Sequence, residues 1–326
     1  MSTATPLKIT PPGSVLPDVE RAMLQPVVDE IERLKVERNA IVAAHNYMTP
    51  DIFELVADIK GDSLYLAEVA RDTEADVIVL AGVNFMADTA KLVNPAKTVL
   101  LPSLEAGCSL ADGITGEDVR QLKAQYPGVP VVTYVNTSAE VKAETDICCT
   151  SGNAVAVVES LGVDRVLFLP DQYLGKYVAT KTDVELILWD GACMVHERFT
   201  GEEMRRHREG LGDLPIIAHP ECPPDVLAEA DYVGSTNGII NWVADNKPER
   251  VMMVTECSMA DNVALSHPET EFVRPCNLCP HMKQITLNGI RNSLATMTHQ
   301  VEIPVDIAAR ARVAVERMLE VGRNEA

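Results

Sequence analysis

Positive charge is scarce in this sequence. It holds 28 Lys and Arg residues against 48 Asp and Glu residues, which gives a formal net charge of −20 over 326 residues. Nucleic acids and anionic membranes attract proteins through basic patches, so this balance argues against both as partners. The sequence also has no apolar run of the ~18 residues that a membrane-spanning helix needs. Because the N-terminus carries no signal-peptide pattern either, we expect a cytoplasmic protein.

Paired metal-binding motifs are missing as well. Cys276 and Cys279 form a CxxC pair, but no second CxxC or CxxH pair accompanies it, which speaks against a structural zinc site. In a reducing compartment, the eight cysteines are not expected to form a disulfide framework. Free cysteines often pack as small apolar residues. We expect such packing or pocket-wall roles for Cys148, Cys149, Cys222 and Cys257.

Short apolar runs alternate with helical patterns along the chain. The runs are rich in β-branched residues and show little polar alternation, which is typical of parallel strands buried on both faces. This pattern predicts an α/β protein with short parallel sheets. The first 20 residues are rich in Pro, Ser and Thr and predict a loosely ordered arm. The apolar runs lie at 40–45, 76–82, 98–102, 129–135, 164–170, 185–189, 214–219, 250–255 and 271–275.

The chain repeats itself about every 85 residues. TGED at 115–118 returns as TGEE at 200–203, and DRV at 164–166 returns as ERV at 249–251. A more diverged copy begins upstream with IVAAHNY at 41–47. Repeats at a fixed period constrain architecture strongly, so we predict three copies of one βα unit around a pseudo-threefold axis, with the site at the centre. The predicted boundaries are an arm at 1–21, a first domain at 22–108 plus 280–326, a second at 109–193 and a third at 194–279.

The repeat connects three cysteines that are far apart in sequence. Cys108, Cys193 and Cys279 each follow the last strand of one copy, so we expect them to converge at the axis. Three thiolates fit a 4Fe-4S cluster whose fourth iron stays open, better than a structural zinc ion with four protein ligands. An open iron can act as a Lewis acid. Cys276 does not follow the period, and two readings stay open for it: a bystander near the cluster, or a redox partner or alternate ligand for Cys279.

Polar side chains recur at two further places in each copy. The first strand ends in polar groups, and ligand sites in parallel sheets lie beyond the carboxyl ends of the strands. A small hydroxyl residue then opens a helix, where free N–H groups can bind phosphate or carboxylate, although such a residue often only caps the helix. His196, three residues after Cys193, can contact substrate or orient the cluster loop. The strand-end residues are His45, Tyr47, Tyr134, Asn136, His219 and Glu221, and the hydroxyl residues are Ser63, Ser151, Ser235 and Thr236.

Several longer motifs resemble those of quinolinate synthase, an iron–sulfur enzyme family of de novo NAD biosynthesis. The resemblance extends from about residue 22 to 321 and implies three analogous αβα domains with short parallel sheets around the pseudo-threefold axis. One departure is that some members carry CxxCxxC where this chain has only CNLC. The motifs are HNYMTPDIFELVADIKGDSLYLA, GVNFMADTAKLVNP, GCSLAD, YVNTSAEVKAETDICCTSGNA, GACMVHERF, HPEC, GST and CPHMKQITL.

The resemblance implies a reaction and a set of roles. The family condenses iminoaspartate with dihydroxyacetone phosphate to give quinolinate, phosphate and water, and the unstable iminoaspartate implies an aspartate oxidase or dehydrogenase as a functional partner. Cys108, Cys193 and Cys279 would ligate the 4Fe-4S cluster. Glu221 would be the general base, with His219 and Tyr47 as proton donors. The remaining substrate-binding residues would be His45, Ser63, Tyr134, Asn136, Ser151, His196, Ser235 and Thr236.

Two other classes of function remain open on the sequence alone. One is a hydro-lyase with a similar three-cysteine cluster, as in aconitase-like dehydratases, acting on an unrelated substrate. The other is a non-catalytic zinc protein in which Cys276 and Cys279 join further ligands to stabilise the fold.

Overall fold

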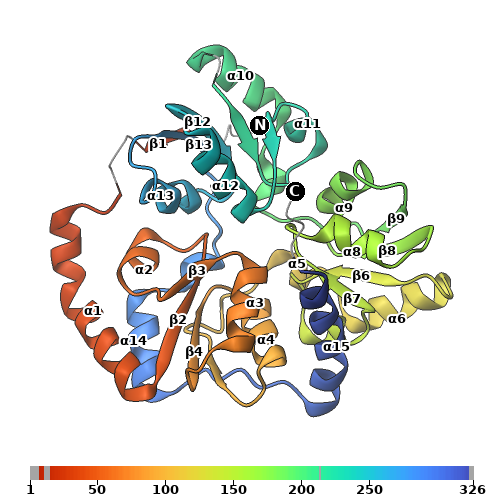
Figure 1. The fold of residues 1–326 in the computed structure, drawn as a ribbon, viewed down its shortest axis with the longest axis horizontal. Helices are drawn as coiled ribbons and strands as arrows, with labels where there is room; N and C mark the ends of the chain where they lie inside the picture. Colours follow the sequence, from red (N-terminus) through yellow and green to blue (C-terminus); the bar gives the residue numbers. More distant parts are fainter. Residues whose placement is uncertain (1–6, 11–14, 213, 323–326) are drawn as a thin grey trace.

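Three small sheets form the frame of the molecule, arranged as a triangle in Figure 1. The computed structural model describes residues 7–10, 15–212 and 214–322. In each sheet four parallel strands follow the same order, which confirms the predicted α/β class and the three analogous layers. We call the parts that carry these sheets the first, second and third unit. In sheet order the strands are β3 (Ile59–Gly61), β2 (Ala40–His45), β4 (Val77–Ala81) and β5 (Thr98–Leu100); β7 (Ile147–Cys149), β6 (Val131–Tyr134), β8 (Arg165–Leu169) and β9 (Glu185–Leu188); and β11 (Tyr232–Val233), β10 (Ile216–Ala218), β12 (Arg250–Val254) and β13 (Glu271–Pro275).

The edge strands β3, β7 and β11 were not predicted from the sequence. Each has only two or three residues, which is too short for a periodic pattern to be visible. Each pairs with the first long strand of its unit and leads directly toward a helix. These short strands therefore carry the chain to the carboxyl edge of the sheet, where those helices begin.

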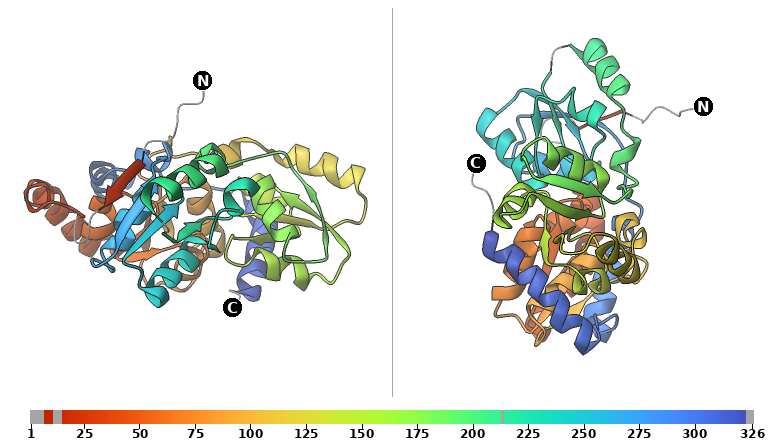
Figure 2. Two further views of the ribbon diagram at one scale, coloured as in Figure 1. Left: turned by 90° about the horizontal axis from the view of Figure 1, so that it is seen from above. Right: turned by 90° about the vertical axis from the view of Figure 1, so that its right-hand side faces the viewer.

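The predicted loose arm contains a strand. Residues Leu7–Thr10 form β1, which pairs antiparallel with β13 at the edge of the third sheet (Figure 2). The prediction of a disordered arm was therefore wrong for these four residues. An edge strand offers unpaired N–H and C=O groups, and β13 presents such an edge. The rest of the arm up to residue 14 lies outside the described residues.

Helices cover the sheets, and their starts repeat like the strands. Thr115, Thr200 and Thr286 cap α6, α10 and α14 with their side chains, and each lies seven residues after one of the three repeat-related cysteines. The helices are α1 (Asp18–Arg38), α2 (Pro50–Leu55), α3 (Ser63–Asp72), α4 (Asn84–Val93), α5 (Ser109–Asp112), α6 (Gly116–Gln125), α7 (Ala139–Ala143), α8 (Ala154–Ser160), α9 (Gln172–Ala179), α10 (Gly201–Leu211), α11 (Pro224–Leu227), α12 (Thr236–Asn246), α13 (Ser258–Ala264), α14 (Leu287–Thr296) and α15 (Val305–Val321), with short 3-10 helices η1 (His196–Arg198) and η2 (Met282–Gln284).

The C-terminal helices join parts of the chain that are distant in sequence. α14 packs beside α1, and α15 packs against α4 of the first unit and against α7, β7 and α8 of the second (Figure 1). The side chain of Asn153 donates hydrogen bonds to the carbonyl groups of Met318 and Gly322 and so holds the end of α15. The boundaries predicted for the three domains remain a prediction, because α15 contacts two units.

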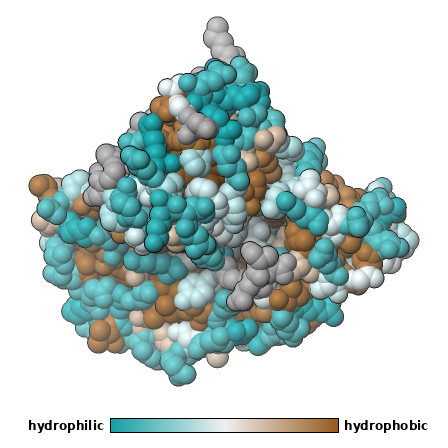
Figure 3. Space-filling view, turned by 45° about the horizontal axis from the view of Figure 1, so that its top comes forward, coloured by the Kyte–Doolittle hydropathy of each residue, from teal (hydrophilic) through white to brown (hydrophobic). Residues whose placement is uncertain are grey.

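Apolar side chains lie between sheets and helices, as the parallel strands require. All five residues of β4 are buried, and the main core continues from the first unit into the second. On the face in Figure 3, hydrophilic side chains alternate with small, scattered hydrophobic areas. None of the described helices is both long enough and apolar enough to cross a bilayer.

Cys276 forms a disulfide with Cys257, which corrects the reading of Cys276 as a redox partner or alternate ligand for Cys279. Cys276 is bonded to Cys257 and not to Cys279, so Cys257 is not a free packing residue. The cause is tertiary: Glu256 and Asn277 form a parallel bridge that continues β12 and β13, so the two cysteines lie with Cα atoms 4.9 Å apart. The other six cysteines are free, and three of them, Cys148, Cys149 and Cys222, are buried as predicted for packing residues.

A buried ion pair secures the strand that leads to Cys279. Arg274 of β13 is 1% exposed and donates to Asp261 of α13 across 2.8 Å. Its Nε also donates to the Cys257 sulfur at 3.3 Å. A buried cation is tolerated only when it is paired, so the pair fixes α13 against β13.

We predict that Asp261→Asn lowers the free energy of unfolding by about 3 kcal/mol, because it removes the carboxylate that pairs with the buried guanidinium. The matched control is Glu185→Gln, which breaks an exposed pair with Arg165 and should cost less than about 1 kcal/mol. Urea unfolding of both variants under the same redox conditions measures the difference. Equal losses in the two variants would contradict the role assigned to Arg274 and Asp261.

Candidate functional site

One cavity lies where the carboxyl ends of the three sheets meet. Thirteen of the fourteen predicted site residues line it, and they come from all three units. The exception is Ser235. The predicted residues in the lining are His45, Tyr47, Ser63, Cys108, Tyr134, Asn136, Ser151, Cys193, His196, His219, Glu221 and Thr236, together with Cys279.

The three cysteines occupy equivalent positions in the three units. Cys108 follows β5, Cys193 follows β9 and Cys279 follows β13. Each sulfur accepts hydrogen bonds from the backbone N–H groups two and three residues further along the chain. The repeat predicted in the sequence is thus kept at the level of individual hydrogen bonds. Such N–H groups stabilise a negatively charged sulfur.

Burial favours the neutral thiol at all three positions. It raises the pKa of Cys108 to about 12, and it also raises the pKa of Cys193 and of Cys279 against the opposing effect of the backbone N–H groups. A bound metal deprotonates a coordinating thiol outright. In the absence of a bound metal, all three cysteines are therefore held as neutral thiols.

One compact group of possible metal ligands lies among the described residues of the cavity. The donors of Cys193, His196 and Glu221 lie within 4.8 Å of one another, a compact group that includes one of the three thiols.

A buried carboxylate faces two imidazole rings at the centre of the cavity. Glu221 is 3% exposed, and its Oε2 lies 2.8 Å from His196 Nδ1 and 3.3 Å from His219 Nδ1. The Asn136 side chain donates to its Oε1 at 3.4 Å. Burial alone would raise the pKa of Glu221, but the interactions with the two histidines outweigh it and lower the pKa. Glu221 is therefore held as a carboxylate.

Two histidines of the cavity, His219 and His45, are held in the neutral form. Burial lowers the pKa of His219 below 6.5, although Glu221 opposes the effect. Burial also lowers the pKa of His45 to about 4, against the attraction of Asp62. Neutral imidazole rings can accept protons at physiological pH, so the cavity contains bases without carrying excess positive charge.

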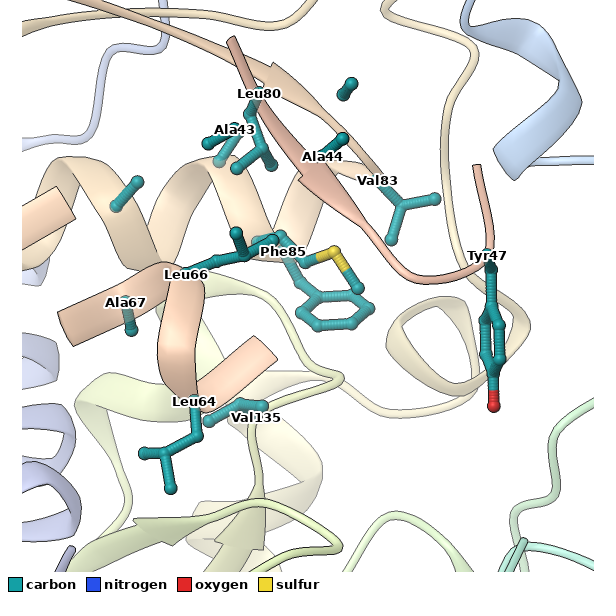
Figure 4. Close-up of a cluster of buried hydrophobic side chains, with 14 of the residues drawn as sticks. Ala43, Ala44, Tyr47, Leu64, Leu66, Ala67, Leu80, Val83, Phe85 and Val135 are labelled. Carbon is teal, nitrogen blue, oxygen red and sulfur yellow. The ribbon is translucent and has the colours of Figure 1, made fainter. Parts of the chain in front are cut away.

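Thr255 connects two predicted site residues that the sequence did not relate to it. Its hydroxyl lies 2.6 Å from the Tyr47 hydroxyl and 3.0 Å from His196 Nε2. Figure 4 shows the Tyr47 ring directed away from the aliphatic side chains near the end of β2, with its hydroxyl at the far tip of the side chain. Burial raises the pKa of Tyr47 well above 10, so the phenol keeps its proton. Thr255 follows β12, and its position at a strand end was the signal that could have revealed it.

Glu256, the next residue, was also missed and supports the third cysteine. It is 1% exposed and accepts hydrogen bonds from the backbone N–H of Cys279 at 3.1 Å and of Ser258 at 2.7 Å. Lys283 lies 3.1 Å from the same carboxylate and compensates its charge. Glu256 therefore fixes the loop that presents Cys279.

At the helix starts, the residues that act as caps are not all the ones that were predicted. Asp62 caps α3 and Ser235 caps α12 through their side chains, while Asn153 occupies the N-cap position of α8. Because the Ser235 hydroxyl accepts from Gly238 N–H, it serves the helix and does not line the cavity. Ser63 and Thr236 are the first helical residues, and their side chains face the cavity instead.

Two of these hydroxyl groups contact other polar residues of the site. The Thr236 hydroxyl accepts a hydrogen bond from the side chain of Asn46 at 2.9 Å, which joins the first and third units. Ser151 lies before α8 and not at its start, and its hydroxyl is 3.2 Å from His219 Nε2. The hydroxyl groups are thus positioned by partners from a different unit.

The fold and the cavity define an α/β protein of three similar units whose shared site combines three thiols, a buried carboxylate and neutral imidazoles. Comparison with known proteins agrees with this description. Residues 29–320 match the family model described as "Quinolinate synthetase A protein". The chain therefore belongs to the quinolinate synthetase A family.

Relatives resemble the chain over nearly its whole length. It is 63% identical to Quinolinate synthase 2 of Mesorhizobium japonicum, over 94% of this chain and 95% of that protein. It is 60% identical to the quinolinate synthase of Agrobacterium fabrum, over 94% of this chain and 89% of that protein. It is 58% identical to the quinolinate synthase of Xylella fastidiosa strain 9a5c, over 90% of this chain and 87% of that protein.

We predict that Thr255→Val lowers the free energy of unfolding by about 2–4 kcal/mol. The valine keeps the shape of the side chain but leaves the Tyr47 hydroxyl and His196 Nε2 without this partner, at about 1–3 kcal/mol for each buried group. Thr255→Ser keeps the hydroxyl and should stay within about 1 kcal/mol of the original chain. Urea unfolding of the cluster-free protein measures both. A valine variant as stable as the serine variant would show that the hydroxyl is not needed.

Proposed function

We propose that this chain is a quinolinate synthase that condenses iminoaspartate with dihydroxyacetone phosphate to give quinolinate, phosphate and water. The observation that carries the proposal is the convergence of Cys108, Cys193 and Cys279 on one cavity that also contains Glu221 and His219. The family membership and the names of the relatives support the same reaction. We place this activity in the cytoplasm and in NAD biosynthesis, with an aspartate oxidase or dehydrogenase as the source of iminoaspartate.

Cys108, Cys193 and Cys279 would hold a 4Fe-4S cluster. Their equivalent loops, each with two N–H groups facing the sulfur, fit a three-thiolate centre. When bound, such a cluster supplies a Lewis acid at the iron that lacks a thiolate ligand. The buried Glu256 would keep the Cys279 loop in place for it.

The substrates bring two carboxylates and a phosphate into a cavity without cationic side chains. None of the described residues that line it is Lys or Arg. Binding would therefore depend on neutral donors: the hydroxyls of Ser63, Ser151 and Thr236, and the N–H groups at the starts of α3 and α12. These donors lie on three units, so a substrate with separated anionic groups would contact all three.

Glu221 and His219 would handle the protons. We assign Glu221 as the general base for enolisation of the triose and for the later proton transfers, with His219 and Tyr47 as donors. The lowered pKa of Glu221 makes the carboxylate a weak base, whereas the neutral His219 ring 3.3 Å away is a stronger one. The two would act as a unit in which the carboxylate orients the ring and shares its proton. Tyr47, with its raised pKa, would remain protonated and available as a donor.

The remaining roles follow from position. His45, Tyr134 and Asn136 would contact the substrates at the ends of β2 and β6, and His196 would join Cys193 to Glu221. Ser235 would act through α12, because its hydroxyl caps that helix. The zinc-protein alternative loses support, because Cys276 is paired with Cys257 and is not free to bind an ion beside Cys279.

We predict that protein purified without oxygen holds about four iron and four sulfide ions per chain. Cys108→Ser should lose most of both, because its thiol cannot be replaced from another unit. The matched control is Cys222→Ala, which removes a buried thiol outside the cavity and should retain the full complement. Metal and acid-labile sulfide analysis measures all three proteins. Zinc with no sulfide in the original chain would overturn the proposed mechanism.

We predict that Glu221→Gln lowers kcat by about 10²–10⁴-fold while iron and sulfide stay unchanged. The pH–rate profile gives a second observable. The pKa of His219 lies below 6.5, so the original enzyme should lose activity only as the pH falls below 6.5. Glu221 raises that pKa, so its removal should move the acid limb to still lower pH. Full turnover in the variant with an intact cluster would refute the assignment of the base.

A further inference from the structure

A compact group of metal-binding atoms lies inside the cavity, and it is not the set of three cysteines. The Cys193 sulfur, His196 Nδ1 and a carboxylate oxygen of Glu221 all lie within 4.8 Å of one another. His196 Nδ1 is 3.1 Å from the sulfur and 2.8 Å from Glu221 Oε2. His196 and Glu221 are buried, and Cys193 is partly buried. His196 Nδ1 therefore lies within hydrogen-bond distance of both the sulfur and the carboxylate oxygen.

The donor set is that of a zinc site with one open position. Catalytic zinc sites use three protein ligands drawn from Cys, His and carboxylates, with water in the fourth position. Zn–S bonds of about 2.3 Å and Zn–N or Zn–O bonds of about 2.0–2.1 Å place tetrahedral ligands about 3.3–3.6 Å apart. His196 Nδ1 lies about half an ångström closer than this to both the sulfur and the carboxylate oxygen, so small side-chain rotations would admit an ion among the three donors.

The surrounding residues hold these donors in place through hydrogen bonds, as the partners of metal ligands do. His196 Nε2 lies 3.0 Å from the Thr255 hydroxyl, which fixes the ring and leaves Nδ1 toward the sulfur. His219 lies 3.3 Å from Glu221, and Asn136 donates to the other carboxylate oxygen. Outer partners of this kind are typical of sites that bind metals tightly.

We propose that the cluster-free chain binds one zinc-type divalent ion through Cys193 Sγ, His196 Nδ1 and the Glu221 carboxylate. The thiol loses its proton to solvent when the ion binds, so the affinity increases with pH. The thiolate favours Zn²⁺ over Mg²⁺ and Ca²⁺, which prefer oxygen ligands. Binding itself does not depend on the proposed function. Its consequence does: an ion that occupies Cys193 excludes a three-cysteine cluster.

Titration of the cluster-free protein with Co²⁺ and Zn²⁺ under anaerobic conditions tests the proposal. Co²⁺ should bind at one ion per chain with an absorption band from a single thiolate, and Zn²⁺ should displace it. Cys193→Ser and His196→Ala should weaken binding by more than ~100-fold, because loss of an outer partner alone costs about 10–100-fold. Thr255→Val should weaken it by about tenfold.

The matched controls are Cys108→Ser and Cys279→Ser, which remove cavity thiols outside the donor group and should leave the affinity unchanged. Equal losses in all three cysteine variants would place the ion among the three thiols and overturn the proposal, as would no binding by the original chain. Circular dichroism checks that each variant is folded. Glu221→Gln, which keeps the side-chain shape, gives the same test without a change of volume and should also lower the affinity.

Reconstitution with iron and sulfide separates this proposal from the proposed function. Protein preloaded with one equivalent of zinc should form cluster more slowly than metal-free protein. Zinc binding in a chain that never forms a cluster would refute the proposed function and leave the zinc site intact. Cluster formation at the same rate with and without zinc, in a chain that binds no zinc, would refute the zinc site alone.

Discussion

The structure depends on one geometric constraint: the parallel strands of all three units end at the same place. A parallel sheet collects its strand-end side chains along one edge. No single unit carries more than one of the three repeat-related cysteines, and Glu221, Asn136 and Tyr47 come from three different units. The cavity therefore exists only when the three units are packed together. This packing is secured by contacts such as those of α15, which lies against two units at once.

The second constraint is the control of charge in a buried space. The chain carries a large negative net charge, and its cavity is lined by no described cation, yet it keeps Glu221 ionised. It does so with imidazole donors from His196 and His219. Burial keeps His219 and His45 neutral and raises the pKa of the cavity thiols. The same arrangement that suits proton transfer also places a sulfur, a nitrogen and an oxygen around one point. The catalytic and metal-binding capacities of the site thus both follow from this one group of side chains.

The errors of the sequence-based prediction have particular physical causes. Ser235 and Thr236 are adjacent hydroxyl residues, and only the backbone geometry decides which one caps α12 and which one faces the cavity. Cys276 was compared with Cys279 because they are close in sequence, but the parallel pairing beyond β12 and β13 places it beside Cys257. The arm strand β1 has no partner of its own in the sequence and gains one from the edge of the third sheet.

The sequence by itself determined the α/β class, the repeat and the convergence of Cys108, Cys193 and Cys279, because the period and the apolar runs are local properties that survive in one dimension. It also identified most of the cavity residues, since strand ends and helix starts can be located from pattern. Only the tertiary structure decided the contacts of Thr255 with Tyr47 and His196, the support of the Cys279 loop by Glu256, and the pairing of Cys257. These are contacts between distant segments, and their distances and burial are set by how the three units pack.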